Sequence, residues 1–192
     1  GEFSDAVASF RKAIQAFPNQ VDSHYNLGVT FLKHGDLQRA IKCFNNAITI
    51  DAKHTKAHIN LGVALKKLGR EKEAILVYAR GIIIDPNSSV LYYNLGLVKM
   101  EDKISLKVRS YFIWATLIDP GYLNAHNNLG IVNRKLSNTD EAVENYKRAI
   151  RLDPFAIEVH NNLGNVYKDL KKYDETRYCF LRSVILDPSH FN

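Results

Sequence analysis

Long apolar runs are missing from this chain of 192 residues, although 46% of the residues are hydrophobic. The most apolar stretch, SYFIWATLI, stops at Asp119 and Pro120 and is about half as long as the roughly 18 residues that a membrane-spanning helix requires. The N-terminal segment GEFSDAVASF lacks the basic start and apolar centre of a secretion signal. We therefore expect no membrane insertion and no secretion signal in this sequence.

Cysteine is equally scarce. The chain has two cysteines, Cys43 and Cys179, and no CxxC pair. Such usage excludes a disulfide-rich scaffold and is typical of reduced thiols inside a cell. We expect a cytoplasmic or nuclear protein.

No contiguous basic surface accompanies the formal net charge of +6. One local cluster consists of Lys53, Lys56, Lys66, Lys67, Arg70 and Lys72. Glu71 and Glu73 interrupt it, whereas a nucleic-acid-binding surface needs an unbroken patch or stripe of positive charge. Nucleic acid is therefore not expected as the primary partner.

Repetition is what the sequence does contain. The tripeptide Asn-Leu-Gly occurs five times, at residues 26–28, 60–62, 94–96, 128–130 and 162–164, with a constant spacing of 34. We divide the chain into blocks 21–54, 55–88, 89–122, 123–156 and 157–190, and number the positions in each block from 1 to 34. Position 8 is then glycine in every block: Gly28, Gly62, Gly96, Gly130 and Gly164.

Further columns repeat a residue type. Position 24 is always aromatic: Phe44, Tyr78, Phe112, Tyr146 and Phe180. Position 27 is always small: Ala47, Gly81, Ala115, Ala149 and Ser183. Apolar residues three and four apart give each segment one buried helical stripe. We predict that the small columns let two helices approach closely and that the aromatic column fills the space beside them.

Position 31 is aspartate in every block, and proline follows it in four of them: Pro86, Pro120, Pro154 and Pro188. A residue before proline is biased away from helical geometry, so the pair ends the second helix of each block. Each block is thus predicted to be a helical hairpin that buries its apolar face only by stacking on its neighbours.

The pattern His24-x2-Leu27-Gly28-x2-Phe31 and Ala40-x3-Phe44 resembles the tetratricopeptide repeat family, with histidine where tryptophan is usual. The resemblance implies an all-α fold, a right-handed α-solenoid of antiparallel helix pairs. Residues 1–20 match the second helix of a truncated repeat, followed by five complete repeats in blocks 21–54, 55–88, 89–122, 123–156 and 157–190. That makes eleven helices in a single continuous solenoid domain, with repeat three, 89–122, the divergent one.

Catalytic or metal-binding patterns are not evident. Position 4 holds His24, His58, His126 and His160, with Tyr92 in block three, but helix axes about 8–10 Å apart separate such residues too widely for a shared ion. We interpret this column as packing residues. The glycines are single rather than clustered in a phosphate-binding loop. We expect no enzyme activity, no metal and no cofactor in this segment.

The family resemblance places a binding surface in a concave groove lined by the first helices. It implies Asn26, Asn60, Asn94, Asn128 and Asn162 at position 6, with Tyr25, Tyr93, Asn127 and Asn161 at position 5 and Lys66, Arg134 and Lys168 at position 12. An asparagine amide both donates and accepts hydrogen bonds, so it can hold a peptide backbone. The column is similar to the asparagine ladder in the tetratricopeptide region of O-GlcNAc transferases. Descent and local packing are an alternative explanation for these asparagines.

Three functions follow. The leading one is a protein–protein interaction scaffold that binds an extended peptide or partner segment in the groove. The alternatives are a substrate-recruiting arm of a larger enzyme, such as a glycosyltransferase, and a self-associating assembly module, a homo-oligomer formed through uncapped ends or the surface described next.

A second contact surface is expected on the convex side of repeat three. Lys107, Tyr111 and Trp114 share one helical face, and Trp114 is the only tryptophan. The same column is polar in the other repeats, and an exposed aromatic patch often marks a partner site. In the alternative interpretation, Trp114 folds back over Ile113 or a neighbouring helix.

Overall fold

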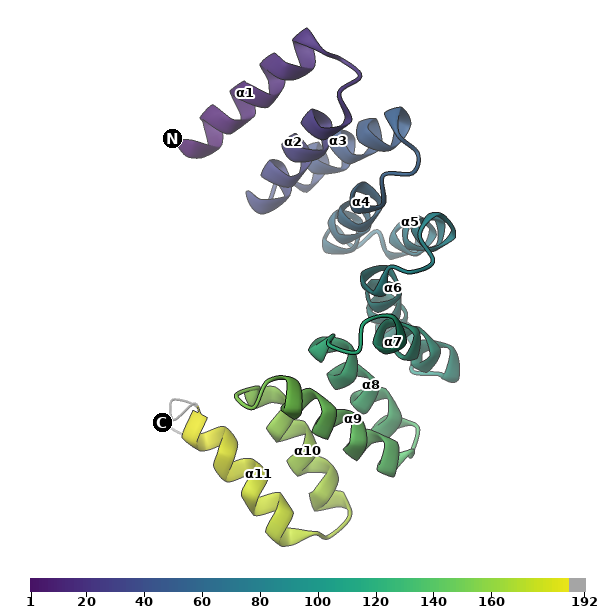
Figure 1. The fold of residues 1–192 in the computed structure, drawn as a ribbon, viewed down its shortest axis with the longest axis vertical. Coiled ribbons are helices and arrows are strands. Elements are labelled where there is room, and N and C mark those ends of the chain that lie inside the picture. Colours follow the sequence, from purple (N-terminus) through teal and green to yellow (C-terminus); the bar gives the residue numbers. More distant parts are fainter. Residues whose placement is uncertain (187–192) are drawn as a thin grey trace. The chain divides into compact units, whose positions relative to one another are not determined.

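The computed structural model describes residues 1–186, which form eleven α-helices and no strand (Figure 1). The helices are α1 (Glu2–Ala16), α2 (Val21–Lys33), α3 (Leu37–Ile50), α4 (Thr55–Lys67), α5 (Glu71–Ile84), α6 (Ser89–Asp102), α7 (Leu106–Ile118), α8 (Leu123–Lys135), α9 (Thr139–Leu152), α10 (Ile157–Asp169) and α11 (Tyr173–Leu186). The predicted all-α class and the eleven helices are confirmed.

The chain divides into two compact units, Gly1–Val98 and the described part of Lys99–Asn192, with the boundary inside α6. In the first unit, α2 packs against α1, α3 and α4. In the second unit, α8 packs against α7, α9 and α10. Each unit therefore shows the expected stacking of successive helix pairs. The continuity of one solenoid domain through both units stays a prediction, as do the individual repeat boundaries.

A left-handed residue ends the first helix in four of the five pairs. Gly35 and Gly69 have φ values of 82° and 75°, and Ser137 and Lys171 adopt the same region at 63° and 59°. The amide one residue further on donates back to the helix, as when Asp36 donates to the carbonyl of Phe31 at 2.9 Å. This is a helix-ending motif that glycine serves without the strain that a Cβ atom causes.

The recurring aspartates end the second helices. Asp51, Asp85, Asp119 and Asp153 follow α3, α5, α7 and α9 directly, and each Oδ1 accepts a hydrogen bond from the backbone amide two residues later, at 2.9–3.2 Å. The side chain thus closes a turn of its own, which adds to the effect of the proline that follows three of these four aspartates. Asp187 and Pro188 lie outside the described residues.

The glycine column receives the aromatic column, as predicted. A Cβ atom placed on Gly62 would lie 2.3 Å from a ring carbon of Tyr78. The same contact would be 2.6–2.8 Å in three other repeats, for the pairs Gly28–Phe44, Gly130–Tyr146 and Gly164–Phe180. Since carbon atoms in contact lie about 3.5–4.0 Å apart, only glycine leaves room for the ring.

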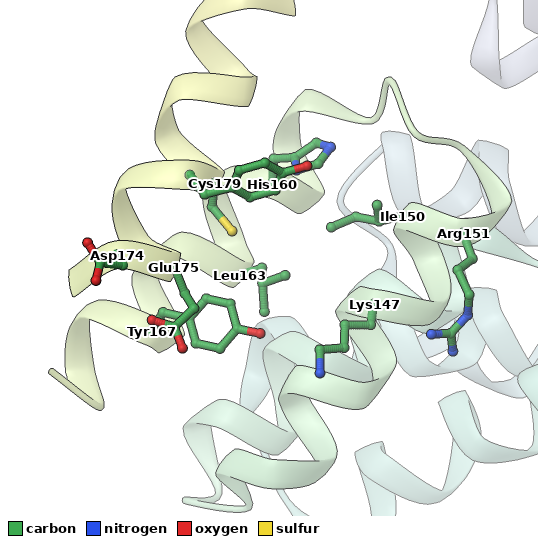
Figure 2. A pocket seen from close by; sticks show the side chains of 10 residues that line it. Lys147, Ile150, Arg151, His160, Leu163, Tyr167, Asp174, Glu175 and Cys179 are labelled. Carbon is green, nitrogen blue, oxygen red and sulfur yellow. The ribbon is translucent and has the colours of Figure 1, made fainter. Parts of the chain in front are cut away.

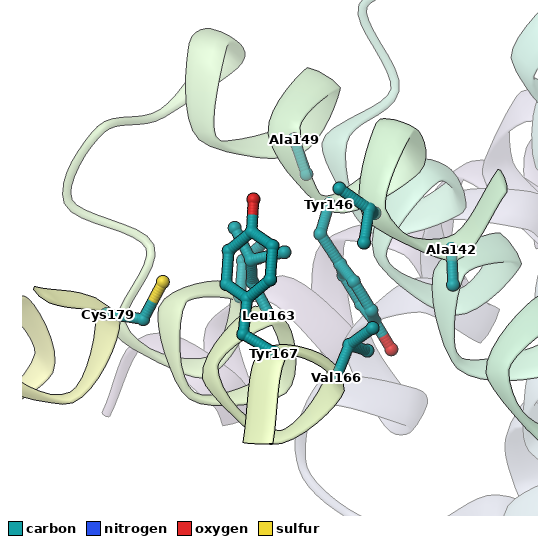
Figure 3. Close-up of a cluster of buried hydrophobic side chains, with 9 residues drawn as sticks. Ala142, Tyr146, Ala149, Leu163, Val166, Tyr167 and Cys179 are labelled. Atoms are coloured by element: carbon teal, nitrogen blue, oxygen red, sulfur yellow. The ribbon is translucent and has the colours of Figure 1, made fainter. Parts of the chain in front are cut away.

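The core between α9, α10 and α11 shows how the rings are enclosed (Figure 3). Tyr146 is 1% exposed and lies among Leu163 and Val166 of α10 and the small residues Ala142 and Ala149 of its own helix. Burying a side chain of this size stabilises the fold by about 1.5–3 kcal/mol. Burial also raises the pKa of the Tyr146 hydroxyl above its ordinary value.

Replacing Gly62 by alanine should lower the free energy of unfolding by about 1–3 kcal/mol, because the new methyl group overlaps the Tyr78 ring. The better helix propensity of alanine, about 1 kcal/mol, offsets only part of this loss. Urea unfolding followed by circular dichroism measures the change. The same substitution should cost clearly less in a Tyr78→Leu background, and equal costs in both backgrounds would contradict this packing.

Candidate functional site

The asparagines of the predicted groove lie on α2, α4, α6, α8 and α10, one on the first helix of each pair. Asn26 is exposed, whereas Asn60, Asn94, Asn128 and Asn162 are half-buried. The column therefore reaches the surface in both units.

In the first unit, Asn60 is bonded to the preceding repeat. Its Nδ2 atom donates to the hydroxyl of Tyr25 at 3.0 Å, so position 6 of one repeat bonds position 5 of the repeat before it. The Tyr25 ring is itself held, with its centroid 6.0 Å from that of Phe44 and 4.9 Å from that of His54.

The second unit contains the same bond in a longer chain of polar groups. Asn162 Nδ2 donates to Asn127 Oδ1 at 3.0 Å, and Asn127 Nδ2 donates to Glu158 Oε1 at 3.1 Å. An ionised carboxylate only accepts hydrogen bonds, so Glu158 sets the orientation of the Asn127 amide. That orientation then requires Asn162 to donate through its nitrogen. One acid, Glu158, thus fixes the orientation of two side-chain amides, those of Asn127 and Asn162.

Asn127 and Asn161, both assigned to the groove from the sequence, differ in burial. Asn127 is 5% exposed, with its amide between Glu158 and Asn162, and Asn161 is half-buried on α10. A buried, doubly bonded amide supports its neighbours rather than facing a ligand. Asn128 Nδ2 donates to the backbone carbonyl of Asn124 at 2.9 Å.

The basic residues of the groove also differ from one another. Arg134 is paired with Asp169, with 2.7 Å between Nη2 and Oδ2 and 3.0 Å between Nε and Oδ2. Lys66 is half-buried and Lys168 is exposed. Sequence reasoning missed the two acids, Glu158 and Asp169. Glu158 occupies position 2 and Asp169 position 13 of the last block, and their charge was the available signal.

Family models match much of the chain. Models described as "TPR repeat" match residues 1–35 and 134–171, and models described as "Tetratricopeptide repeat" match residues 21–54, 55–88 and 157–190. The chain belongs to the tetratricopeptide repeat family. No curated protein matches the chain in sequence.

Solved structures of other tetratricopeptide proteins share the fold. MamA from Desulfovibrio magneticus RS-1, solved from residue 41 to its end, aligns with a TM-score of 0.78 and 19% identity over 90% of this chain and 97% of that chain. YrrB, described as a TPR protein with an unusual peptide-binding site, aligns with a TM-score of 0.76 and 19% identity over 94% of this chain and 93% of its own. PilF from Pseudomonas aeruginosa aligns at 0.76 and 21% identity, over 86% and 80% of the two chains. These likenesses establish the fold, which is typical of non-enzymatic interaction modules, and no catalytic family is indicated.

The histidines of the tetratricopeptide repeats are structural. His24, His58, His126 and His160 are each at most 9% exposed. Each Nε2 atom lies 2.9–3.1 Å from the backbone carbonyl six residues earlier, in the turn that precedes its helix. The ring thereby ties the turn to the helix. Among residues 1–186, no group of three or more potential metal ligands comes together.

The residues that the sequence analysis assigns to the convex side of repeat three lie on α7. Trp114 is 52% exposed, Lys107 is exposed and Tyr111 is half-buried. Two leucines of the same helix that the sequence argument did not include, Leu106 and Leu117, are 72% and 64% exposed. The indole is therefore not deeply buried, and α7 presents more apolar surface than predicted.

Replacing Asn127 by aspartate should lower the free energy of unfolding by about 1–3 kcal/mol at pH 7. The change removes the donor to Glu158 and sets two carboxylates side by side. Urea unfolding measures the loss, and Asn161→Asp, at the same position of the next repeat, is the matched control. Adding Glu158→Gln should restore most of the stability by supplying a new amide donor. A double variant as unstable as the single one would contradict the proposed chain of hydrogen bonds.

Proposed function

We propose that the tetratricopeptide array is a protein-interaction scaffold in which each unit binds an extended peptide segment along its first helices. The observation that carries the proposal is the pair of oriented amides, Asn60 in the first unit and Asn162 in the second. Each uses its Nδ2 atom to hold the preceding repeat. The carbonyl oxygen of each side chain then accepts a hydrogen bond from a peptide N–H group.

The spacing of the repeats suits such a ligand. First helices that pack about 8–10 Å apart advance by roughly three residues of extended peptide at about 3.3 Å each. One asparagine per repeat thus contacts the peptide backbone once every three residues and makes no contact with the peptide side chains in between. The likeness in fold to YrrB, with its peptide-binding site, agrees with this proposal. The asparagine column is similar to that of O-GlcNAc transferases.

The side chains beside the asparagines determine which peptide residues each surface prefers. In the first unit Tyr25, Tyr93 and Lys66 accompany the asparagines, and we assign this surface to apolar or aromatic peptide side chains. In the second unit, Asp169 neutralises Arg134, which leaves Lys168 to attract acidic residues. In the alternative function, the chain is the arm of a larger enzyme, such as a glycosyltransferase, and the same surfaces recruit its substrates.

The proposed location is the cytoplasm or nucleus, since both cysteines are free thiols. Within residues 1–186, no helix is long and apolar enough to cross a membrane.

The peptide surface is tested with a ligand selected on the intact chain from a display library of random peptides. Asn60→Ala and Asn162→Ala should each weaken the affinity of a peptide bound to their own unit, by about 0.5–1.5 kcal/mol for the lost hydrogen bond. Titration calorimetry measures the dissociation constants. Asn45→Ala, on the exposed side of α3, is the matched control. Unchanged affinity in both groove variants, with the helical circular dichroism intact, would refute the ladder.

We further propose that the apolar face of α7, formed by Leu106, Tyr111, Trp114 and Leu117 beside Lys107, is a second contact surface, either for self-association or for a partner protein. Trp114→Ala should change the free energy of unfolding by no more than about 0.5 kcal/mol, as for other surface substitutions. It should lower self-association in sedimentation velocity or partner capture in a pull-down. Arg80→Ala, at the same position of repeat two, is the control. If neither measurement changes for Trp114→Ala, the face has no binding role.

A further inference from the structure

The first unit contains a cleft of about 370 Å³ that the peptide surface does not use. Its floor is formed by His24, Leu27 and Phe31 of α2, and its walls by α1 and α3. The volume falls in the range of ordinary small-ligand pockets, about 300–1,000 Å³. The cleft is large enough for one aromatic or long aliphatic side chain.

The cleft lies on the opposite side of α2 from the proposed peptide surface. Its floor residues are spaced by three and four along the helix, which places them on one face. Tyr25 and Asn26 lie between them in sequence and point elsewhere, because each residue turns the helix by about 100°. A ligand in the cleft and a peptide on the asparagines therefore do not compete for the same atoms.

The last repeat contains an equivalent cleft, of about 470 Å³, between α9 and α11 (Figure 2). His160, Leu163 and Tyr167 of α10 occupy the floor positions. Cys43 lines the first cleft and Cys179 the last, both at position 23 of their repeats. The other repeats have Val77, Tyr111 and Asn145 at that position. Valine and tyrosine are larger than cysteine, so the small thiol side chain leaves space that they would fill.

The rims of the two clefts differ in charge. The residues that line the first cleft include three cations, Arg11, Arg39 and Lys42, and no acid. Arg39 is paired with Asp36, so Arg11 on α1 and Lys42 on α3 provide the charge that has no ion-pair partner among the described residues. The last cleft is mixed, with Lys147 and Arg151 on the α9 side and Asp174 and Glu175 on the α11 side, as Figure 2 shows.

The charges near the two clefts act differently on the pKa values of the two thiols. Burial raises the pKa of Cys43, but Lys42, Arg11 and Arg39 all oppose the rise by favouring the thiolate. At Cys179, burial and the charge of Glu175 act together and raise the pKa to about 11. Three cations and one anion, Asp36, thus act on Cys43, whereas the charge that acts on Cys179 is the anion Glu175.

We propose that the cleft above His24, Leu27 and Phe31 binds an apolar side chain carried by an acidic segment of a partner protein. The apolar side chain fills the space that Cys43 leaves, and carboxylates on either side of it pair with Arg11 on α1 and Lys42 on α3. The charge pattern selects against a basic segment, because one would place like charges together. The last cleft, with its mixed rim, does not select this partner.

The two cysteines provide a direct test on the intact chain. The probe is a blocked peptide with one phenylalanine between two pairs of glutamates, and the control peptide has lysines in place of the glutamates. Bromobimane labelling of each thiol is followed by mass spectrometry. At twice its dissociation constant, the acidic peptide should slow the labelling of Cys43 about threefold and leave that of Cys179 unchanged. Unchanged Cys43 labelling at millimolar peptide, or equal protection by both peptides, would overturn the proposal.

Charge reversal supplies matched variants. Arg11→Glu combined with Lys42→Glu should raise the dissociation constant of the acidic peptide about tenfold, since two attractive pairs become repulsive. Lys147→Glu combined with Arg151→Glu, which reverses the two cations that line the last cleft, should leave it unchanged. Cys43→Val, which copies Val77 of repeat two, should weaken binding without altering charge. Equal effects of the two double variants, with circular dichroism intact, would also overturn the assignment.

Discussion

The close contact between a glycine on the first helix and an aromatic ring on the second is the constraint on which the rest of the structure depends. A Cβ atom on Gly62 would lie 2.3 Å from the Tyr78 ring, so replacing this glycine requires the ring or one of the two helices to move. The contact recurs along the chain and sets how near the helices of each pair lie. Stacked pairs then bring position 5 of one repeat within hydrogen-bonding distance of position 6 of the next. A shift of one ångström would break these bonds, whose donor–acceptor distances are already close to 3.0 Å.

This packing gives each first helix two different surfaces. On α2, the residues His24, Leu27 and Phe31 face the second helices, where the histidine also holds the preceding turn. The intervening Asn26 is exposed, and the half-buried Tyr25 has its ring centroid 6.0 Å from that of Phe44. Positions 5 and 6 carry the hydrogen bonds that join neighbouring repeats. Position 23 lies on the second helices, where Cys43 and Cys179 line the two clefts.

The polar chain from Glu158 through Asn127 to Asn162 connects repeats in a different way. Its bonds join residues up to 35 apart in sequence, so they couple neighbouring repeats directly. A buried amide such as Asn127 is costly unless both of its ends are bonded, and here both are. The interface between these repeats is therefore specific as well as apolar. The orientation of the Asn162 amide is decided by Glu158, a residue on the same helix.

The columns of the 34-residue period determined the helix pairs, their ends and the glycine–aromatic contact, because each depends on residue type at fixed spacing within one repeat. The tertiary structure decided what depends on side chains of different repeats. It buried Asn127, although the sequence placed it in the groove, and it paired Arg134 with Asp169. Periodicity gives the face on which a residue lies but not which neighbour its flexible side chain reaches. The clefts at Cys43 and Cys179 also depend on the tertiary structure, because side chains of three helices line each of them.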